Sequence, residues 1–182
     1  MSLLKSIQDG EGKTVEFKVE LPNSNTLAKT IIAFSNTGGG KLIIGVNDQG
    51  EIIGLEPDVN IFELKDKVAS IIYETCYPTV LPDIYTTTID DQLLLIIEVY
   101  RGNLLPYYLK NKGKNEGVYI RVGATNRKAS HENILELERQ RMNISFDQEA
   151  NREVELDSLD ISSLEGGFVR AGKVLDQPVM KN

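Results

Sequence analysis

The most constraining feature of the sequence is a nearly continuous apolar run early in the chain. Residues 41–46 read Lys-Leu-Ile-Ile-Gly-Val, which is typical of a central strand covered on both faces. Residues 47–50 form a turn sequence, and residues 51–54 return as the second arm of a hairpin. The run therefore predicts the centre of a sheet around which the other elements are arranged.

The segment before this run alternates polar and apolar residues without a break from Thr14 to Leu21. This period of two predicts a half-buried strand that places Glu16 and Lys18 on one polar face. The residues predicted to face the core are Val15, Phe17, Val19 and Leu21. An amphipathic helix is expected to start near Ser24 and to end at the glycines 38–40.

Further elements follow with clear boundaries. A second helix is expected over residues 61–72, and residues 84–89 and 93–100 are expected to be strands joined at Asp90-Asp91. Residues 118–122 form another predicted strand, and Ser130 is a plausible cap for a last helix. These elements give an α+β fold with about three helices.

The length of 182 residues and the 41% hydrophobic content suit one core with a tail. We expect one domain over residues 1–145, and an acidic linker or the truncated entry to a further C-terminal domain over residues 146–182. No apolar run approaches the roughly 20 residues of a membrane span. The start of the chain has no signal sequence, and Cys76 is the single cysteine, so a cytoplasmic location is expected.

The formal net charge of -7 is unevenly distributed along the chain. Residues 101–128 contain only one acidic residue, Glu116, against seven basic ones, which we call the basic stripe: Arg101, Lys110, Lys112, Lys114, Arg121, Arg127 and Lys128. A stripe of this kind indicates phosphate binding, although a solvated loop would have the same composition. Tyr107, Tyr108 and Tyr119 flank it, and packing is favoured over stacking on bases as their role.

The glycines 38–40 do not indicate a phosphate-binding loop. Such a loop lies before the N-terminus of a helix, and its Lys is followed by Ser or Thr. Here the glycines follow a predicted helix, and Lys41 is followed by Leu42. A helix stop with tight backbone packing is the favoured interpretation.

Three carboxylates are candidates for an all-oxygen metal site. Glu11 lies just before the first strand, Glu16 lies on its polar face with Lys18, and Asp48 lies in the hairpin turn. If they converge, Glu11, Glu16 and Asp48 would suit Mg²⁺ or Mn²⁺ and would serve phosphodiester hydrolysis, with Lys18 at the edge of the site. The alternatives are ordinary ones, because a turn Asp is usually a cap and a strand Glu is usually solvated.

Five blocks, in this order, resemble the Schlafen AlbA domain family over most of residues 8–140. They are Glu11-x4-Glu16-Phe17-Lys18, residues 33–40, residues 44–48 with 53–55, Pro106-Tyr107-Tyr108, and residues 119–126. The resemblance implies a mixed sheet with helices and a nucleic-acid-binding function in bacterial regulators. Animal members of the family that cut RNA have an active site of three acidic residues. The resemblance implies that Glu11, Glu16 and Asp48 correspond to them here. Some members are described as ATP-binding, but this sequence has no Walker motif.

The leading hypothesis is a non-catalytic nucleic-acid-binding domain of a bacterial transcription regulator that binds DNA or RNA through the basic stripe. It requires no cofactor. One alternative is a metal-dependent ribonuclease that uses Mg²⁺ or Mn²⁺ at the three carboxylates. The other is a dimerisation or protein-interaction module. The ribonucleases of the family pair two lobes, so a chain with one lobe is expected to form a homodimer.

Overall fold

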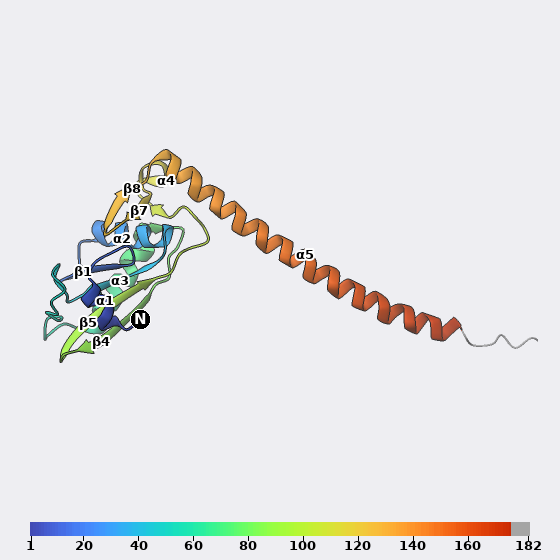
Figure 1. The fold of residues 1–182 in the computed structure, drawn as a ribbon, viewed down its shortest axis with the longest axis horizontal. Coiled ribbons are helices and arrows are strands. Elements are labelled where there is room, and N and C mark those ends of the chain that lie inside the picture. Colours follow the sequence, from blue (N-terminus) through green and yellow to red (C-terminus); the bar gives the residue numbers. More distant parts are fainter. Residues whose placement is uncertain (176–182) are drawn as a thin grey trace, which may run out of the picture. The chain divides into compact units, whose positions relative to one another are not determined.

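The computed structural model describes the backbone of residues 1–175 and the side chains of residues 1–154. Residues 1–141 form one compact unit and residues 142–182 a second. Every strand of the described residues lies in the first unit, which has the expected α+β architecture (Figure 1). No helix in the described part is both long and apolar enough to cross a membrane.

A four-stranded mixed sheet with the order β1-β2-β5-β4 organises the first unit. Its strands are β1 (Val15–Lys18), β2 (Gly40–Ile44), β4 (Asp83–Ile89) and β5 (Gln92–Val99). β1 runs parallel to β2, and the other pairs are antiparallel. The apolar run is therefore a central strand, as predicted, and the 51–54 return contributes a single bridge between Val46 and Ile52.

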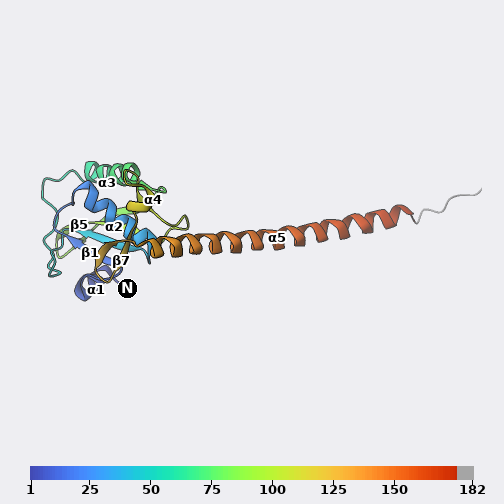
Figure 2. The same cartoon turned by 90° about the horizontal axis from the view of Figure 1, so that it is seen from above.

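Helices cover both faces of this sheet (Figure 2). On one face α2 (Ser24–Asn36) and α3 (Ile61–Thr75) build the larger core cluster with residues such as Leu42 and Leu95. On the other face Ile7 of α1 (Leu3–Asp9) packs with Phe17 and Ile43 in a smaller cluster. The short helix α1 was not predicted, because a single buried residue, Ile7, gives no periodic signal.

The predicted strand over residues 14–21 is shorter than expected, because only Val15–Lys18 pair with β2. Val19 is 42% exposed and does not face the core, whereas Phe17 is fully buried. Glu16 is buried as well, because α2 and a small hairpin cover the face that the alternation had marked as polar. Alternation identified the strand but not which of its faces is solvated.

The glycines 38–40 end α2, as predicted. The backbone N–H of Gly39 donates to the carbonyl of Phe34 at 2.9 Å. Gly39 has a φ of +73°, and a Cβ at this position would lie 2.6 Å from the carbonyl oxygen of Val99. A glycine is required here because the end of β5 passes so close to the backbone.

The remaining elements frame one end of the first unit. β3 (Cys76–Tyr77) pairs with β6 (Tyr108–Leu109), and β7 (Tyr119–Val122) pairs with β8 (Thr125–Lys128). A four-residue helix, α4 (Gly113–Glu116), precedes β7. The last helix, α5, starts at His131 behind Ser130, whose hydroxyl accepts from the backbone N–H of Asn133 at 3.1 Å.

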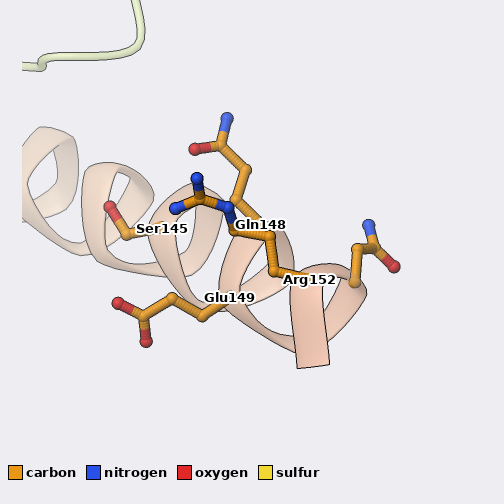
Figure 3. A pocket seen from close by; sticks show the side chains of 5 residues that line it. Ser145, Gln148, Glu149 and Arg152 are labelled. Atoms are coloured by element: carbon orange, nitrogen blue, oxygen red, sulfur yellow. The ribbon is translucent and has the colours of Figure 1, made fainter. Parts of the chain in front are cut away.

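Helix α5 continues to Leu175 and does not end near residue 146. The segment expected to be a linker is thus helical over most of its length, and residues 176–182 lie outside the described part. Side chains of Ser145, Gln148, Glu149 and Arg152 outline a shallow hollow on this helix (Figure 3). All its lining residues come from one helix, so the hollow offers no enclosed surface to a ligand.

Candidate functional site

The predicted carboxylate site is a buried ion pair in the structure. Glu16 is 6% exposed, and its carboxylate lies 2.6 Å from Nη1 of Arg121, whose side chain is fully buried. Nζ of Lys18 lies 3.3 Å from the other carboxylate oxygen of Glu16. Glu16 and Lys18 do share one face, as the alternation predicted. The second cation on that face, Arg121, comes from β7, more than 100 residues away in the sequence.

The remaining donors of Arg121 are also used by the fold. Its Nε and Nη2 donate to the carbonyl of Gly12 at 3.1 and 2.9 Å, and Nη2 also donates to the carbonyl of Val15 at 3.1 Å. The guanidinium lies 5.1 Å from the centre of the Phe34 ring. Arg121 thus joins β7 to the start of β1. Its inclusion in the solvent-facing basic stripe was wrong, because no part of its side chain is exposed.

Two polar residues that the sequence did not single out complete this network. The hydroxyl of Thr30 lies 3.4 Å from each carboxylate oxygen of Glu16. The amide of Asn126 donates to Thr30 at 2.9 Å, and its oxygen accepts from Arg121 at 2.8 Å. Thr30 is a polar residue within the apolar stretch of α2, which is the one sequence signal that was available. With these partners, the buried charges of Glu16 and Arg121 are paired and hydrogen-bonded.

The three carboxylates do not converge. Glu11 accepts a hydrogen bond from the backbone N–H of Phe17 at 2.7 Å, while Asp48 is exposed in the turn after β2. Within the described residues, no three His, Cys, Asp or Glu side chains are grouped so that they could hold a metal ion. Because Glu16 is neutralised by Arg121 and Lys18, these three residues do not fit a divalent cation. The sequence analysis expected them to converge, and the structure places them apart.

Asn36 fixes the elements that carry the basic residues. Its amide donates to the carbonyls of Tyr107 and Tyr119 at 2.9 Å each, and its oxygen accepts from the N–H of Tyr107 at 2.7 Å. Tyr107 and Tyr119 are buried, and the ring of Tyr108 packs on Tyr77 with centroids 5.4 Å apart. The three tyrosines pack within the domain, as the sequence favoured, and the buried pair presents no ring to a base.

The basic stripe apart from Arg121 lies on the surface. Its exposed residues are Arg101, Lys110, Lys112, Lys114, Arg127 and Lys128. Figure 1 shows α4, β7 and β8, which carry or adjoin most of them, gathered around the start of α5. Segments that are apart in the sequence are thus brought to one region of the first unit.

Several of these cations have partners at the surface. Lys114 pairs with Glu138 and Lys128 with Glu116, while Arg101 donates to Gln140. The ammonium of Lys128 lowers the pKa of the Glu116 carboxyl through a hydrogen bond and its charge. In the described part of the chain, Lys112 and Arg127 form no ion pair. Lys110 forms none there either, but its ammonium donates to the carbonyl of Tyr73 at 2.8 Å. Lys112 and Arg127 are therefore the most available to an incoming anion.

A hollow of about 310 Å³ adjoins the stripe at the end of α2. Arg101 and Lys13 line it together with Thr37, Gly38 and residues of the first turns of α5. Lys13 was missed in the sequence because it stands alone, far from the stripe. Glu136 also lines the hollow, and hydrogen bonds, chiefly from Arg139, lower the pKa of its carboxyl to about 2. Its negative charge partly offsets the two cations, so the hollow extends the basic surface only weakly.

Comparisons with known proteins found one family and similar solved structures. A family model described as Schlafen, AlbA_2 matches residues 11–130. The crystal structure of the DIP2311 protein from Corynebacterium diphtheriae matches with 23% identity and a TM-score of 0.50, over 70% of this chain but only 24% of that one. The N-terminal domain of a RecG-related protein from Nitrosomonas europaea matches with 22% identity and a TM-score of 0.47, over 70% and 91%. Curated proteins gave no match.

Proposed function

Because this chain belongs to the Schlafen AlbA_2 family, we propose that it is a nucleic-acid-binding domain of a bacterial transcription regulator. The exposed residues of the basic stripe contact the phosphate backbone, and the buried residues of the family blocks hold those elements in place. The proposal includes a homodimer and a further C-terminal domain, both of which follow from the family resemblance.

The observation that carries the proposal is the exposure of six cations on neighbouring elements of one unit: Arg101, Lys110, Lys112, Lys114, Arg127 and Lys128. Lysine and arginine side chains that neutralise phosphates release counterions, and this release supplies most of the sequence-independent affinity for nucleic acids. Such contacts position a protein on the backbone without reading bases. The function proposed is therefore binding with little sequence preference through this surface.

The surface ion pairs of the stripe are compatible with this function. Lys114 and Lys128 pair with Glu138 and Glu116, and all four side chains are substantially exposed. Exposed pairs of this kind contribute only about 0 to 1 kcal/mol. Each lysine can therefore exchange a carboxylate for a phosphate at little cost.

A charge-removal experiment tests the proposal. Lys112→Gln combined with Arg127→Gln removes two stripe cations that form no ion pair with any residue that the structure describes, so the free energy of unfolding should change little. Affinity for a fluorescent duplex DNA, a single-stranded DNA and a tRNA should fall for every sequence tested, by roughly tenfold or more in 0.1 M salt.

The matched control is Lys5→Gln with Lys67→Gln, which removes the same charge from exposed positions on α1 and α3. Its affinity should stay close to that of the unmodified protein. Equal losses in the two double variants would mean that net charge, and not the basic stripe, governs binding.

A further inference from the structure

The sheet of the first unit ends in an edge strand, β4. Its seven residues pair with β5 in unbroken register from Asp83 opposite Glu98 to Ile89 opposite Gln92. Within the described residues, its other side has no strand partner, because β4 is last in the order β1-β2-β5-β4 (Figure 1). This edge presents a row of backbone N–H and C=O groups that an extended chain can pair with.

The sequence of β4 has little of the usual protection of an edge, because its one charged residue, Asp83, lies at the very start of the strand. Asp-Ile-Tyr-Thr-Thr-Thr-Ile contains no Lys, no Pro and no Gly, and its register has no bulge. Thr, Ile and Tyr are among the residues most favourable to a strand. Long edges of this kind are normally blunted by charges, proline or bulges, so β4 is suited to accept another strand.

An apolar hollow of about 420 Å³ lies beside the start of this strand. Tyr73 of α3, Val80, Leu81 and Ile84 line it, together with Glu74. Leu81 is 84% exposed and Tyr73 is 64% exposed, which is unusual for large apolar side chains gathered at one place. A strand that extends β4 would place an apolar side chain near this hollow.

The charge around the edge indicates the chemistry of the partner. Residues 68–100 contain no Lys or Arg but five acidic residues: Glu74, Asp83, Asp90, Asp91 and Glu98. Glu98 lies 3.6 Å from Lys41, whereas the other four are exposed at the hollow, at the start of β4 and in the turn that ends it. One cation, Lys110, reaches the rim of the hollow at Tyr73. The four exposed carboxylates outnumber it, so the edge as a whole repels nucleic acid and attracts cations.

The same charges disfavour a second copy of this chain as the partner. Two β4 strands paired antiparallel about Thr86 would place Asp83 of each copy opposite Ile89 and next to Asp90 of the other. Like charges across a strand pair are destabilising. A strand with Lys or Arg at its ends has no such conflict.

We propose that the β4 edge with its adjoining hollow is a docking site for an extended basic segment of a partner protein. The segment adds a strand next to β4, inserts an apolar side chain into the hollow beside Leu81 and places Lys or Arg against Glu74, Asp83 and Asp90. This surface touches the basic stripe at Tyr73, whose carbonyl accepts from Lys110 at 2.8 Å, but Lys112 and Arg127 do not line the hollow. One domain would therefore hold a nucleic acid and a protein on adjoining surfaces.

A synthetic peptide tests this proposal with the whole chain. The probe is a fluorescent ten-residue peptide of alternating valine and threonine with two lysines at each end. Fluorescence anisotropy measures its binding to the protein. In NMR spectra of the protein, the bound peptide should shift the backbone amide signals of residues 83–89. The same peptide with alternate backbone amides methylated, and a version with Glu in place of Lys, should each bind at least tenfold more weakly.

Variants of the protein test whether the peptide binds at the hollow beside β4. Leu81→Ala should weaken peptide binding about tenfold, while Phe62→Ala should not, although Phe62 is equally exposed at 82% on α3 and does not line the hollow. Lys112→Gln with Arg127→Gln should leave peptide binding unchanged and lower only nucleic-acid binding. Equal binding of the lysine and glutamate peptides, or loss of binding in Phe62→Ala as large as in Leu81→Ala, would overturn the proposal. A protein that already dimerises through residues 83–89, with the peptide competing against dimerisation, would assign the edge to a second copy instead.

Discussion

At the scale of single residues, the pairing of Glu16 with Arg121 explains why the family blocks contain charged residues without forming a metal site. Both side chains are buried, and the donors of Arg121 are all directed at Glu16, at backbone carbonyls or at Asn126. Ionised groups in a protein interior are tolerated when each has a partner and its remaining hydrogen bonds are made. The pair is therefore part of the framework that places β7 and β8.

Arg121→Met should destabilise the protein by about 3 to 5 kcal/mol, because it leaves the buried carboxylate of Glu16 without its main partner. Urea denaturation followed by circular dichroism measures this change in the free energy of unfolding. The double variant Arg121→Met, Glu16→Gln should recover a large part of the loss, since it removes both charges together. A loss below about 1 kcal/mol in the single variant would show that the pair is not structural.

Cys76 is a free cysteine whose side chain is buried. Burial raises the pKa of its thiol to about 11, from 9.0, so the thiolate is scarce in the folded protein at neutral pH. Alkylation by iodoacetamide at pH 8 should be slow in the folded protein and fast in urea. Because the unfolded thiol loses its proton at lower pH than the folded one, stability should be fully present below pH 9 and should decline as the pH rises toward 11. Fast stoichiometric labelling without urea would contradict the burial of this side chain.

At the scale of elements, the sequence predicts those helices and strands whose hydrophobic pattern lies within the element itself. Each of these patterns lies within a single element: the alternation before Pro22, the apolar run of β2, and the apolar stripes of α2 and α3. Which face of a strand is covered depends on residues far away in the chain. Glu16 is buried only because Thr30, Arg121 and Asn126 meet it from other elements, and no pattern in residues 14–21 reveals that.

The predicted convergence of the three carboxylates is absent from the described residues for the same reason. The five-residue spacing of Glu11 and Glu16 is a local feature, and local spacing does not fix which side chains meet across the fold. Glu11, just before β1, accepts from the backbone N–H of Phe17 in that strand, and Asp48 remains in its turn. The helix α5 beyond residue 146 was missed because its apolar residues are sparse, which weakens the periodic signal on which such predictions depend.

The turn between β4 and β5 was predicted correctly and offers a test of strand geometry. Asp90 and Asp91 have φ values of 50° and 60°, the left-handed conformation that a tight two-residue hairpin requires. Asp91→Gly should stabilise the protein by roughly 0.5 to 1 kcal/mol, because glycine adopts this conformation without strain from a Cβ atom. Asp91→Val should do the opposite, since a branched side chain is least tolerant of a positive φ. Thermal denaturation of both variants checks the prediction, and equal melting temperatures would contradict a left-handed backbone at Asp91.

At the scale of the whole molecule, acidic and basic residues of the first unit are grouped in different segments of the sequence. Residues 68–100 carry only acidic charges, and residues 101–128 carry seven basic charges against one acidic. An acidic chain can therefore still bind phosphate, because the local field near the basic stripe decides how a charged partner approaches. The net charge of -7 limits non-specific adhesion elsewhere on the surface.

The salt dependence of nucleic-acid affinity tests this account most directly. If about four cations of the basic stripe engage phosphates, the logarithm of the association constant for duplex DNA should fall with the logarithm of salt concentration at a slope of roughly -3 to -4. Lys112→Gln with Arg127→Gln should reduce that slope by about 1.8, while Lys5→Gln with Lys67→Gln should leave it unchanged. An affinity that does not respond to salt, or an equal slope in both double variants, would contradict binding through the basic stripe.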